Sequence, residues 1–288
     1  MIHGRGTYTA EGIKTIASAI SVSASLTSID LSSNCIQEEG AKLIADGIAD
    51  NAMSSLKHIN LGYNMLRAEG AKHIAECIAV STSSLTSINI SSNLLGPEGG
   101  KCIAEGIAAS TSLKCIELSR NNLGVVGARY IAEGIAESTS LTNIGLFFNM
   151  LTDEGVKHIA KGISNSASLT SINLLKNPFG PEGVKHIAEG VAVSASLKSI
   201  HLGYKDHSIG WAARNIAEGI SISVSLTSID LQYARIGPEG AKYIAEGIFV
   251  SASLTSIDLR YNRIEAKGGQ AIAEAVSVSA SLTKVSAI

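Results

Sequence analysis

The sequence predicts an α/β solenoid in which one strand–helix unit is repeated along the chain. The first observation is an eleven-residue pattern with aliphatic residues at four positions and asparagine at the ninth, as in LKCIELSRNNL from Leu113 to Leu123. The second is the interval between copies, which is 28 to 30 residues. The third is the segment between copies, where apolar residues recur at helical spacing. Nine complete units start at Leu26, Leu56, Leu85, Leu113, Leu141, Leu169, Leu197, Leu226 and Leu254.

This pattern resembles the leucine-rich repeat, and its period is similar to that of the subclass typified by ribonuclease inhibitor. The resemblance covers residues 11–288 and implies a right-handed solenoid, or horseshoe, with a concave parallel β-sheet and convex α-helices. We expect a single domain over residues 1–288, with an N-terminal helical cap (1–24), nine repeats (25–280) and a terminal strand (281–288). Since no helix follows that strand, we expect either that the chain is a cut domain or that a partner or a second copy covers the open edge.

The first half of each unit is expected to form a short strand followed by a buried asparagine. Aliphatic side chains such as Ile29 and Leu31 point inward, while Ser28 and Asp30 point outward. The asparagine beyond the strand, such as Asn64, is expected to bond the backbone of the neighbouring loop and to form a ladder through the stack. Removing one such amide should cost roughly 1–3 kcal/mol.

The second half of each unit is expected to be a helix with one apolar stripe. Pro97, Pro181 and Pro238 each follow glycine and precede glutamate, which is typical of the first turn of a helix. Glycine recurs at one helical position although it costs about 1 kcal/mol of helix propensity, so we expect it to let adjacent helices approach closely. These glycines are Gly106, Gly134, Gly162, Gly190, Gly219 and Gly247.

Composition and charge exclude several classes of function. The net charge is −2 and the pI about 6.4, which disfavours non-specific binding to nucleic acid or to an anionic membrane. The four cysteines form no CxxC pair, so we expect free thiols in a reducing compartment. The N-terminus resembles no secretion signal, and no apolar run is long enough for a membrane helix. We therefore expect a cytoplasmic protein.

Motifs for catalysis, metal binding and cofactor binding are missing from the sequence. The segment GPEGGK from Gly96 to Lys101 has the wrong spacing for a phosphate loop. His73, His158 and His186 share one helical position a whole unit or more apart, which disfavours a common metal ion. We expect no enzyme activity, no metal and no cofactor.

The informative differences between the repeats lie at the two residues before the ladder asparagine. Six of the chain's 12 aromatic residues occupy the two positions before it, where helix packing does not require them. We predict a protein-binding patch there, although Tyr204, Tyr233 and Tyr261 could instead only stack at the ~4.8 Å spacing of strands. The candidate partner-binding residues are Arg120, Phe147, Phe148, Leu175, Lys176, Tyr204, Trp211, Tyr233, Arg260 and Tyr261.

The segment YKDHSIGWAAR, from Tyr204 to Arg214, breaks the repeat pattern and holds the only tryptophan, Trp211. Two interpretations remain open. The segment bulges beside the tyrosines and extends the binding surface, or Trp211 fills a gap left by a shortened helix start.

The favoured function is a non-catalytic intracellular module that binds a protein partner on its concave face. The SLTSI and IAEGIA units resemble repeats of bacterial effectors and of protist proteins. The protein is expected to be a bacterial effector, which would act in the host cell cytoplasm, or the repeat domain of a sensor. One alternative is a GTPase-activating protein in which Arg120 acts on a bound nucleotide. Another is a scaffold that self-associates through its open C-terminal edge.

Overall fold

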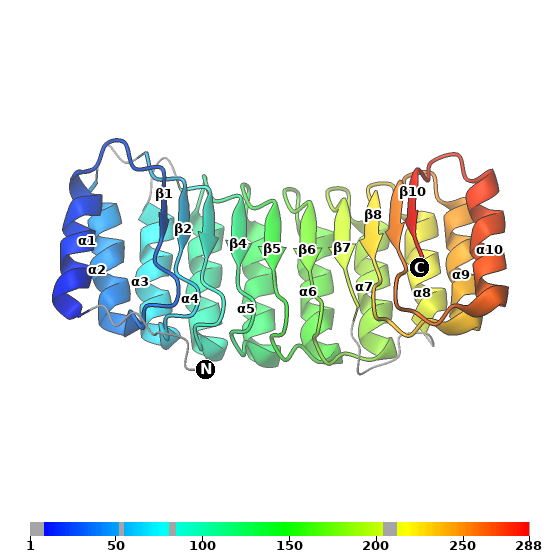
Figure 1. The fold of residues 1–288 in the computed structure, drawn as a ribbon, viewed down its shortest axis with the longest axis horizontal. Helices are drawn as coiled ribbons and strands as arrows, with labels where there is room; N and C mark the ends of the chain where they lie inside the picture. Colours follow the sequence, from blue (N-terminus) through cyan, green and yellow to red (C-terminus); the bar gives the residue numbers. More distant parts are fainter. Residues whose placement is uncertain (1–8, 52–54, 81–84, 204–211, 288) are drawn as a thin grey trace. The chain divides into compact units, whose positions relative to one another are not determined.

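The computed structural model describes residues 9–51, 55–80, 85–203 and 212–287 of the chain (Figure 1). The chain divides into two compact units, Met1–Asn149 and Met150–Ile288. Within the described residues, each unit alternates helices and three-residue strands in chain order. The single continuous domain expected from the repeats, with its cap and terminal strand, stays a prediction.

The first unit contains five helices and five strands among its described residues. They are α1 (Ala10–Val22), β1 (Ser28–Asp30), α2 (Gln37–Ala49), β2 (His58–Asn60), α3 (Arg67–Val80), β3 (Ser87–Asn89), α4 (Gly96–Ala109), β4 (Cys115–Glu117), α5 (Gly124–Glu137) and β5 (Asn143–Gly145). The helix α1 lies where the sequence predicts a helix without a strand before it.

The second unit repeats the same alternation over its described residues. It contains α6 (Asp153–Asn165), β6 (Ser171–Asn173), α7 (Pro181–Val193), β7 (Ser199–His201), α8 (Ala213–Ile222), β8 (Ser228–Asp230), α9 (Gly237–Val250), β9 (Ser256–Asp258), α10 (Glu265–Val278) and β10 (Lys284–Ser286). Pro181 is the first residue of α7, whereas Pro97 and Pro238 are the second residues of α4 and α9.

Within each unit, strands of successive repeats pair in parallel, as predicted. Within the first unit, Ile29 lies opposite Ile59, and Ile88 lies opposite Ile116, so equivalent positions of the repeat face each other. The helices of each unit pack side by side on one face of its strands (Figure 1). Aliphatic side chains of both layers, such as Leu118, are buried between them. A parallel sheet covered on this face accounts for the continuous aliphatic columns in the sequence.

The predicted asparagine ladder is confirmed. Asn121 is 0% exposed, and its Nδ2 donates to the carbonyls of Ile90 and Leu118, each at 2.9 Å. Its Oδ1 accepts from the backbone N–H of Asn93 at 2.8 Å. In the second unit the ladder position of the eighth repeat holds Ala234, which is also fully buried, so the ladder lacks a side-chain amide there.

A second ladder, made by serines, lies at the turn before each strand. Ser140 Oγ donates to the carbonyls of Ser110 and Leu113 in the preceding repeat, each at 2.9 Å. Ser138 Oγ accepts from the backbone N–H of Leu141 at 3.1 Å. Ser225 and Ser253 repeat this arrangement in the second unit. The recurring linker serines therefore satisfy buried backbone groups.

The recurring helix glycines bring adjacent helices together, as predicted. A Cβ on Gly134 would lie 2.7 Å from the carbonyl oxygen of Ala104 on the preceding helix, and one on Gly247 would lie 2.8 Å from Cα and O of Ala217. Real Cβ atoms do not approach backbone this closely. In contrast, a Cβ on Gly269 in α10 would meet no atom within 4 Å.

Replacing these two glycines is expected to have opposite effects on stability. Gly247→Ala should lower the free energy of unfolding by about 1–3 kcal/mol, because α8 and α9 must separate to admit the methyl group. Gly269→Ala should raise it by up to about 1 kcal/mol through helix propensity. Urea unfolding of the two variants beside the native chain measures both effects. Equal changes in the two variants would refute the packing role of Gly247.

Every helix in the described part of the chain is too short or too polar to span a bilayer.

Candidate functional site

The post-strand surface consists of the two residues that follow the last aliphatic residue of each strand motif, such as Phe147 and Phe148. In every described repeat the second of these residues has a positive φ, from 53° to 62°. This left-handed conformation costs an L-residue roughly 1–2 kcal/mol and is rare for aromatic side chains. The buried asparagine that follows each of these residues in most repeats holds the loop in place. The exposed residues at this position include Tyr63, Arg120, Phe148, Lys176, Tyr233 and Tyr261.

The phenylalanine cluster, formed by Arg120, Phe147 and Phe148, lies in the first unit. The Phe148 side chain is 47% exposed, while Phe147 is half-buried. Their ring centroids are 6.3 Å apart, and the Arg120 guanidinium carbon lies 5.5 Å and 5.8 Å from the centroids of Phe147 and Phe148. These distances permit cation–π attraction. The cluster thus presents apolar surface beside a fixed positive charge.

Glu117 is the last residue of β4 and lies three residues before Arg120 of this cluster. Its carboxylate accepts hydrogen bonds from the Ser119 backbone N–H at 2.9 Å and from the Ser119 hydroxyl. It lies over Gly145, because a Cβ at that position would overlap the carboxylate. Glycine at the end of β5 therefore leaves room for an acidic side chain on the neighbouring strand.

The tyrosine pair, Tyr233 and Tyr261, lies in the second unit. Its rings stack with centroids 4.4 Å apart and an interplanar angle of 7°. This part of the predicted tyrosine ladder is confirmed. Partial desolvation, the neighbouring Tyr261 phenol and a hydrogen bond to it raise the pKa of Tyr233. Both rings remain more than two-fifths exposed, so stacking leaves an accessible edge of each.

A chain of polar contacts runs across β7, β8 and β9 beside the tyrosine pair. His201 Nδ1 lies 3.4 Å from Asp230 Oδ2. Gln232 Nε2 donates to Asp230 at 3.2 Å and to Asp258 at 3.1 Å, which joins the two carboxylates. Arg260 then makes a two-pronged contact with Asp258, with Nη2–Oδ2 at 2.6 Å and Nε–Oδ1 at 3.0 Å. Arg260 is therefore fixed in place and half-buried.

Sequence reasoning missed the acidic and amide residues at the strand ends. Asp30, Asn60, Asn89, Asn173 and Asp230 each accept a hydrogen bond from the backbone N–H two residues later, at 2.9–3.1 Å. Such bonds close a local turn. The available signal was the recurrence of Asp or Asn at the last position of strands β1 to β9, interrupted by Glu117, Gly145 and His201.

Acid should weaken the second unit through Asp230. Burial alone would raise the pKa of this carboxyl, but its hydrogen bonds to His201 and Gln232 lower it overall. The stability it contributes is therefore present above the unfolded-state pKa and is lost as pH falls through the lowered folded-state value. Urea unfolding at about pH 5 and about pH 3 should show a smaller loss for Asp230→Asn than for the native chain, by about 0.2–1 kcal/mol. An equal loss would contradict this role.

The structure divides the predicted patch between the two units. Lys176, Tyr233 and Tyr261 are exposed, whereas Leu175, expected to be exposed, is half-buried, as Phe147 is. These half-buried positions precede the left-handed residue, so their side chains lie closer to the sheet. Tyr204 and Trp211 fall outside the described residues, and so does most of the irregular segment around them.

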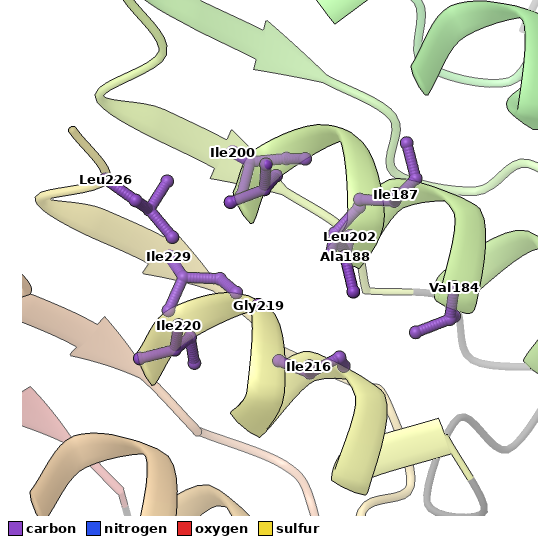
Figure 2. A pocket seen from close by; sticks show the side chains of 11 residues that line it. Val184, Ile187, Ala188, Ile200, Leu202, Ile216, Gly219, Ile220, Leu226 and Ile229 are labelled. Carbon is purple, nitrogen blue, oxygen red and sulfur yellow. The ribbon is translucent and has the colours of Figure 1, made fainter. Parts of the chain in front are cut away.

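The second unit encloses an apolar cavity that is not a ligand site. It lies between α7, α8, β7 and β8, and the side chains of Ile187, Ile200, Ile216 and Ile229 point into it (Figure 2). The volume open to the centre of a water molecule in this cavity is only about 10 Å³. The cavity therefore has room for about one water. Val191 lines it where most other repeats carry isoleucine, so the cavity marks a missing methylene group.

The histidines predicted not to share a metal lie beside glutamates of their own helices. His73 Nδ1 lies 3.4 Å from Glu76, and His186 Nδ1 lies 3.4 Å from Glu189. Among the described residues, no three His, Cys, Asp or Glu side chains gather closely enough to hold a metal ion. All four cysteines lie in described ranges and are free thiols, as predicted; burial, followed by the charge of Asp46, raises the pKa of Cys77 to about 12.

The comparisons with known proteins agree on the fold. The model of a family described as Leucine Rich repeat matches seven segments that together make up more than half of the chain: residues 22–45, 52–75, 82–104, 109–132, 165–188, 223–245 and 250–273. No curated protein matches significantly. Among solved structures, the chain is similar to the leucine-rich repeat-containing protein LegL7 from Legionella pneumophila, with a TM-score of 0.62 and 20% identity over 97% of this chain and 88% of that one.

Proposed function

Because this chain belongs to the leucine-rich repeat family, we propose that it is a non-catalytic recognition module that binds a protein partner through its post-strand surface. This surface corresponds to the concave face expected from the sequence. Stacked repeats generate long surfaces of this kind, on which side chains vary while the core stays constant. The assignment to the ribonuclease-inhibitor-like subclass stays a prediction.

The observation that carries this proposal is the phenylalanine cluster. Two adjacent phenylalanines, one of them 47% exposed, occupy positions where other repeats of the first unit have serine, glycine, tyrosine or arginine. Neither side chain is required by the aliphatic core of the repeat. Aromatic groups beside an arginine are the typical anchors of protein interfaces, so a partner that presents apolar and acidic groups would fit this cluster.

The position of Arg120 supports binding over GTPase activation. Its guanidinium lies over the rings of Phe147 and Phe148, where it forms part of an apolar–cationic surface. An arginine that acts on a nucleotide must instead extend to the transferring phosphoryl group. We also infer a cytoplasmic location, in the host cell if the protein is a bacterial effector, because four free thiols suit a reducing compartment.

Affinity capture with matched variants tests the proposal. The Phe147→Ala, Phe148→Ala double variant should lose a partner that the native chain retains, and its Kd for that purified partner should rise by about thirtyfold or more, as the loss of an interface anchor implies. Tyr130→Ala is the control, because Tyr130 also stacks with an arginine, Arg129 at 4.6 Å, but lies on α5.

The capture experiment has a clear negative outcome. If the native chain, the phenylalanine variant and Tyr130→Ala retain the same proteins, with equal affinity, the cluster is a structural feature and the proposed binding surface is wrong. Matched urea unfolding curves for the three proteins exclude loss of folding as the cause of any difference.

A further inference from the structure

A row of exposed apolar side chains lies on the helix layer of the second unit, away from the post-strand surface. This helix-end row consists of the last residues of four consecutive helices: Val193 of α7, Ile222 of α8, Val250 of α9 and Val278 of α10. They are 68%, 55%, 61% and 60% exposed. Because these helices pack side by side (Figure 1), their ends form a continuous strip.

The packing of the repeat does not require this row. At the equivalent position α1 and α3 end in valine, whereas α4 ends in Ala109, α5 in Glu137 and α6 in Asn165. Polar or small residues therefore fold equally well there. Two further exposed groups extend the strip, Phe249 at 64% and Val224 at 82%. Apolar surface concentrated in this way on a soluble domain is typical of an interaction site.

Two grooves run beside the helix-end row. The groove between α7 and α8, of about 240 Å³, is lined by Glu189, Glu218 and Ile222, and also by the basic residue Lys185. The groove between α8 and α9, of about 290 Å³, is lined by Glu218, Glu246 and Val250, and also by the basic residue Arg214, so each groove carries two glutamates and one basic side chain. Each glutamate lies four residues before the apolar helix end, so both project from the same face of the helix. Each groove thus has a carboxylate on both walls and an apolar residue at its end.

The carboxylates of Glu218 and Glu246 are available to a partner. Lys185 and Lys242, one turn before the glutamates of the grooves, pair instead with Glu182 at 3.6 Å and Glu239 at 2.8 Å. Within the described ranges, the side chains of Glu218 and Glu246 form no ion pair or hydrogen bond. A cation that binds Glu218 or Glu246 would therefore not have to displace an existing partner, whereas Glu189 already lies 3.4 Å from His186 Nδ1.

We propose that this surface binds a basic amphipathic helix of a partner protein. The apolar face of that helix would cover the helix-end row, and its lysine or arginine side chains would enter the two acidic grooves. Neighbouring packed helices lie about 8–10 Å apart, so the grooves recur at this distance. Two basic residues seven positions apart on a helix are separated by about 10.5 Å, which matches this spacing.

The charges on this face distinguish that occupant from two others. An anionic membrane would be repelled by the glutamates beside the apolar strip. A second copy, docked strip against strip, would place net-negative grooves against each other, because each groove is lined by two glutamates and one basic residue. A basic amphipathic helix would cover the helix-end row with its apolar face and pair its basic side chains with the glutamates of the grooves.

Binding of a designed peptide tests this proposal. The probe is a fluorescent helical peptide of about 18 residues, with leucines on one face and lysines spaced seven apart, followed by fluorescence anisotropy. We expect saturable binding to the native chain that weakens as salt rises. Glu218→Gln, Glu246→Gln and, separately, Ile222→Ser, Val250→Ser should each weaken it about tenfold or more, as loss of charged or apolar anchors does.

Glu105→Gln, Glu133→Gln is the matched control. It removes the equivalent glutamates of α4 and α5, which end in Ala109 and Glu137, and it should leave binding unchanged. The proposal is overturned if the probe does not bind, if both glutamine pairs weaken it equally, or if a peptide with glutamines in place of lysines binds as tightly. Tighter association with anionic lipid vesicles than with the probe would overturn the proposal in favour of a membrane. A dimer that the Ile222→Ser, Val250→Ser variant no longer forms would overturn it in favour of a second copy of this chain.

Discussion

Leu118→Ala is expected to lower the free energy of unfolding by about 2–5 kcal/mol. Leu118 follows β4 and is 0% exposed, so the substitution removes several methyl groups from a packed core and leaves a cavity there. The inward orientation predicted from the repeat is confirmed by this burial. Because strand pairing in the first unit holds the neighbouring repeats in place, the site can collapse only in part. Urea unfolding followed by circular dichroism measures the change.

Leu94→Ala is the matched control for this substitution. Leu94 belongs to the same unit and follows the same kind of strand, but its side chain is 60% exposed. Its truncation should change the free energy of unfolding by no more than about 0.5 kcal/mol. A Leu118→Ala loss no larger than that of Leu94→Ala would show that the strand aliphatics do not stabilise the core as argued.

Asn121→Ala is expected to cost about 3 kcal/mol, the upper part of the range for a buried polar group whose partners lose their bonds. The amide accepts from the N–H of Asn93 and donates to the carbonyls of Ile90 and Leu118. Alanine leaves all three buried backbone groups without this partner. The effect reaches the preceding repeat, because Asn93 and Ile90 belong to it.

Asn34→Ala should cost less, and it serves as the comparison for Asn121→Ala. Asn34 is half-buried, and among the described residues its Nδ2 donates only to carbonyls of its own repeat, Leu31 at 2.9 Å and Ser32 at 3.0 Å. Urea unfolding measures the loss of unfolding free energy for each variant. The ratio of the two losses shows how much the hydrogen bonds between repeats contribute. If Asn34→Ala proves as costly as Asn121→Ala, local turn formation is the main role of the asparagines.

The ladder also explains how bulky side chains occupy left-handed backbone. Arg120 and Asn122, on either side of Asn121, have φ of 57° and 55°. Each residue in this left-handed conformation costs free energy, and contacts within its own loop do not offset that cost. The bonds of Asn121 and the backbone contact from Arg120 N–H to the Phe147 carbonyl, at 2.8 Å, hold the loop from both sides. Arg120 thereby stays exposed on the post-strand surface.

The repeat pattern by itself determined most of the fold. The column represented by Leu118 predicted the inward face of the strands, Asn121 predicted the ladder, and Gly247 predicted the close approach of helices. These features depend on contacts between equivalent positions of adjacent repeats. Because each position meets its own counterpart one unit away, the spacing in the sequence specifies the neighbour in space.

Only the tertiary structure decided how the variable side chains meet. The stacking of Tyr233 on Tyr261, the placement of Arg120 over two phenylalanines and the contact of Gln232 with two carboxylates depend on side-chain direction and loop backbone, which repeat spacing does not specify. The half-buried state of Phe147 beside exposed Phe148 has the same origin, since φ becomes positive only at the second residue. Periodicity specifies which residues are neighbours, whereas backbone geometry decides which of their surfaces a partner can reach.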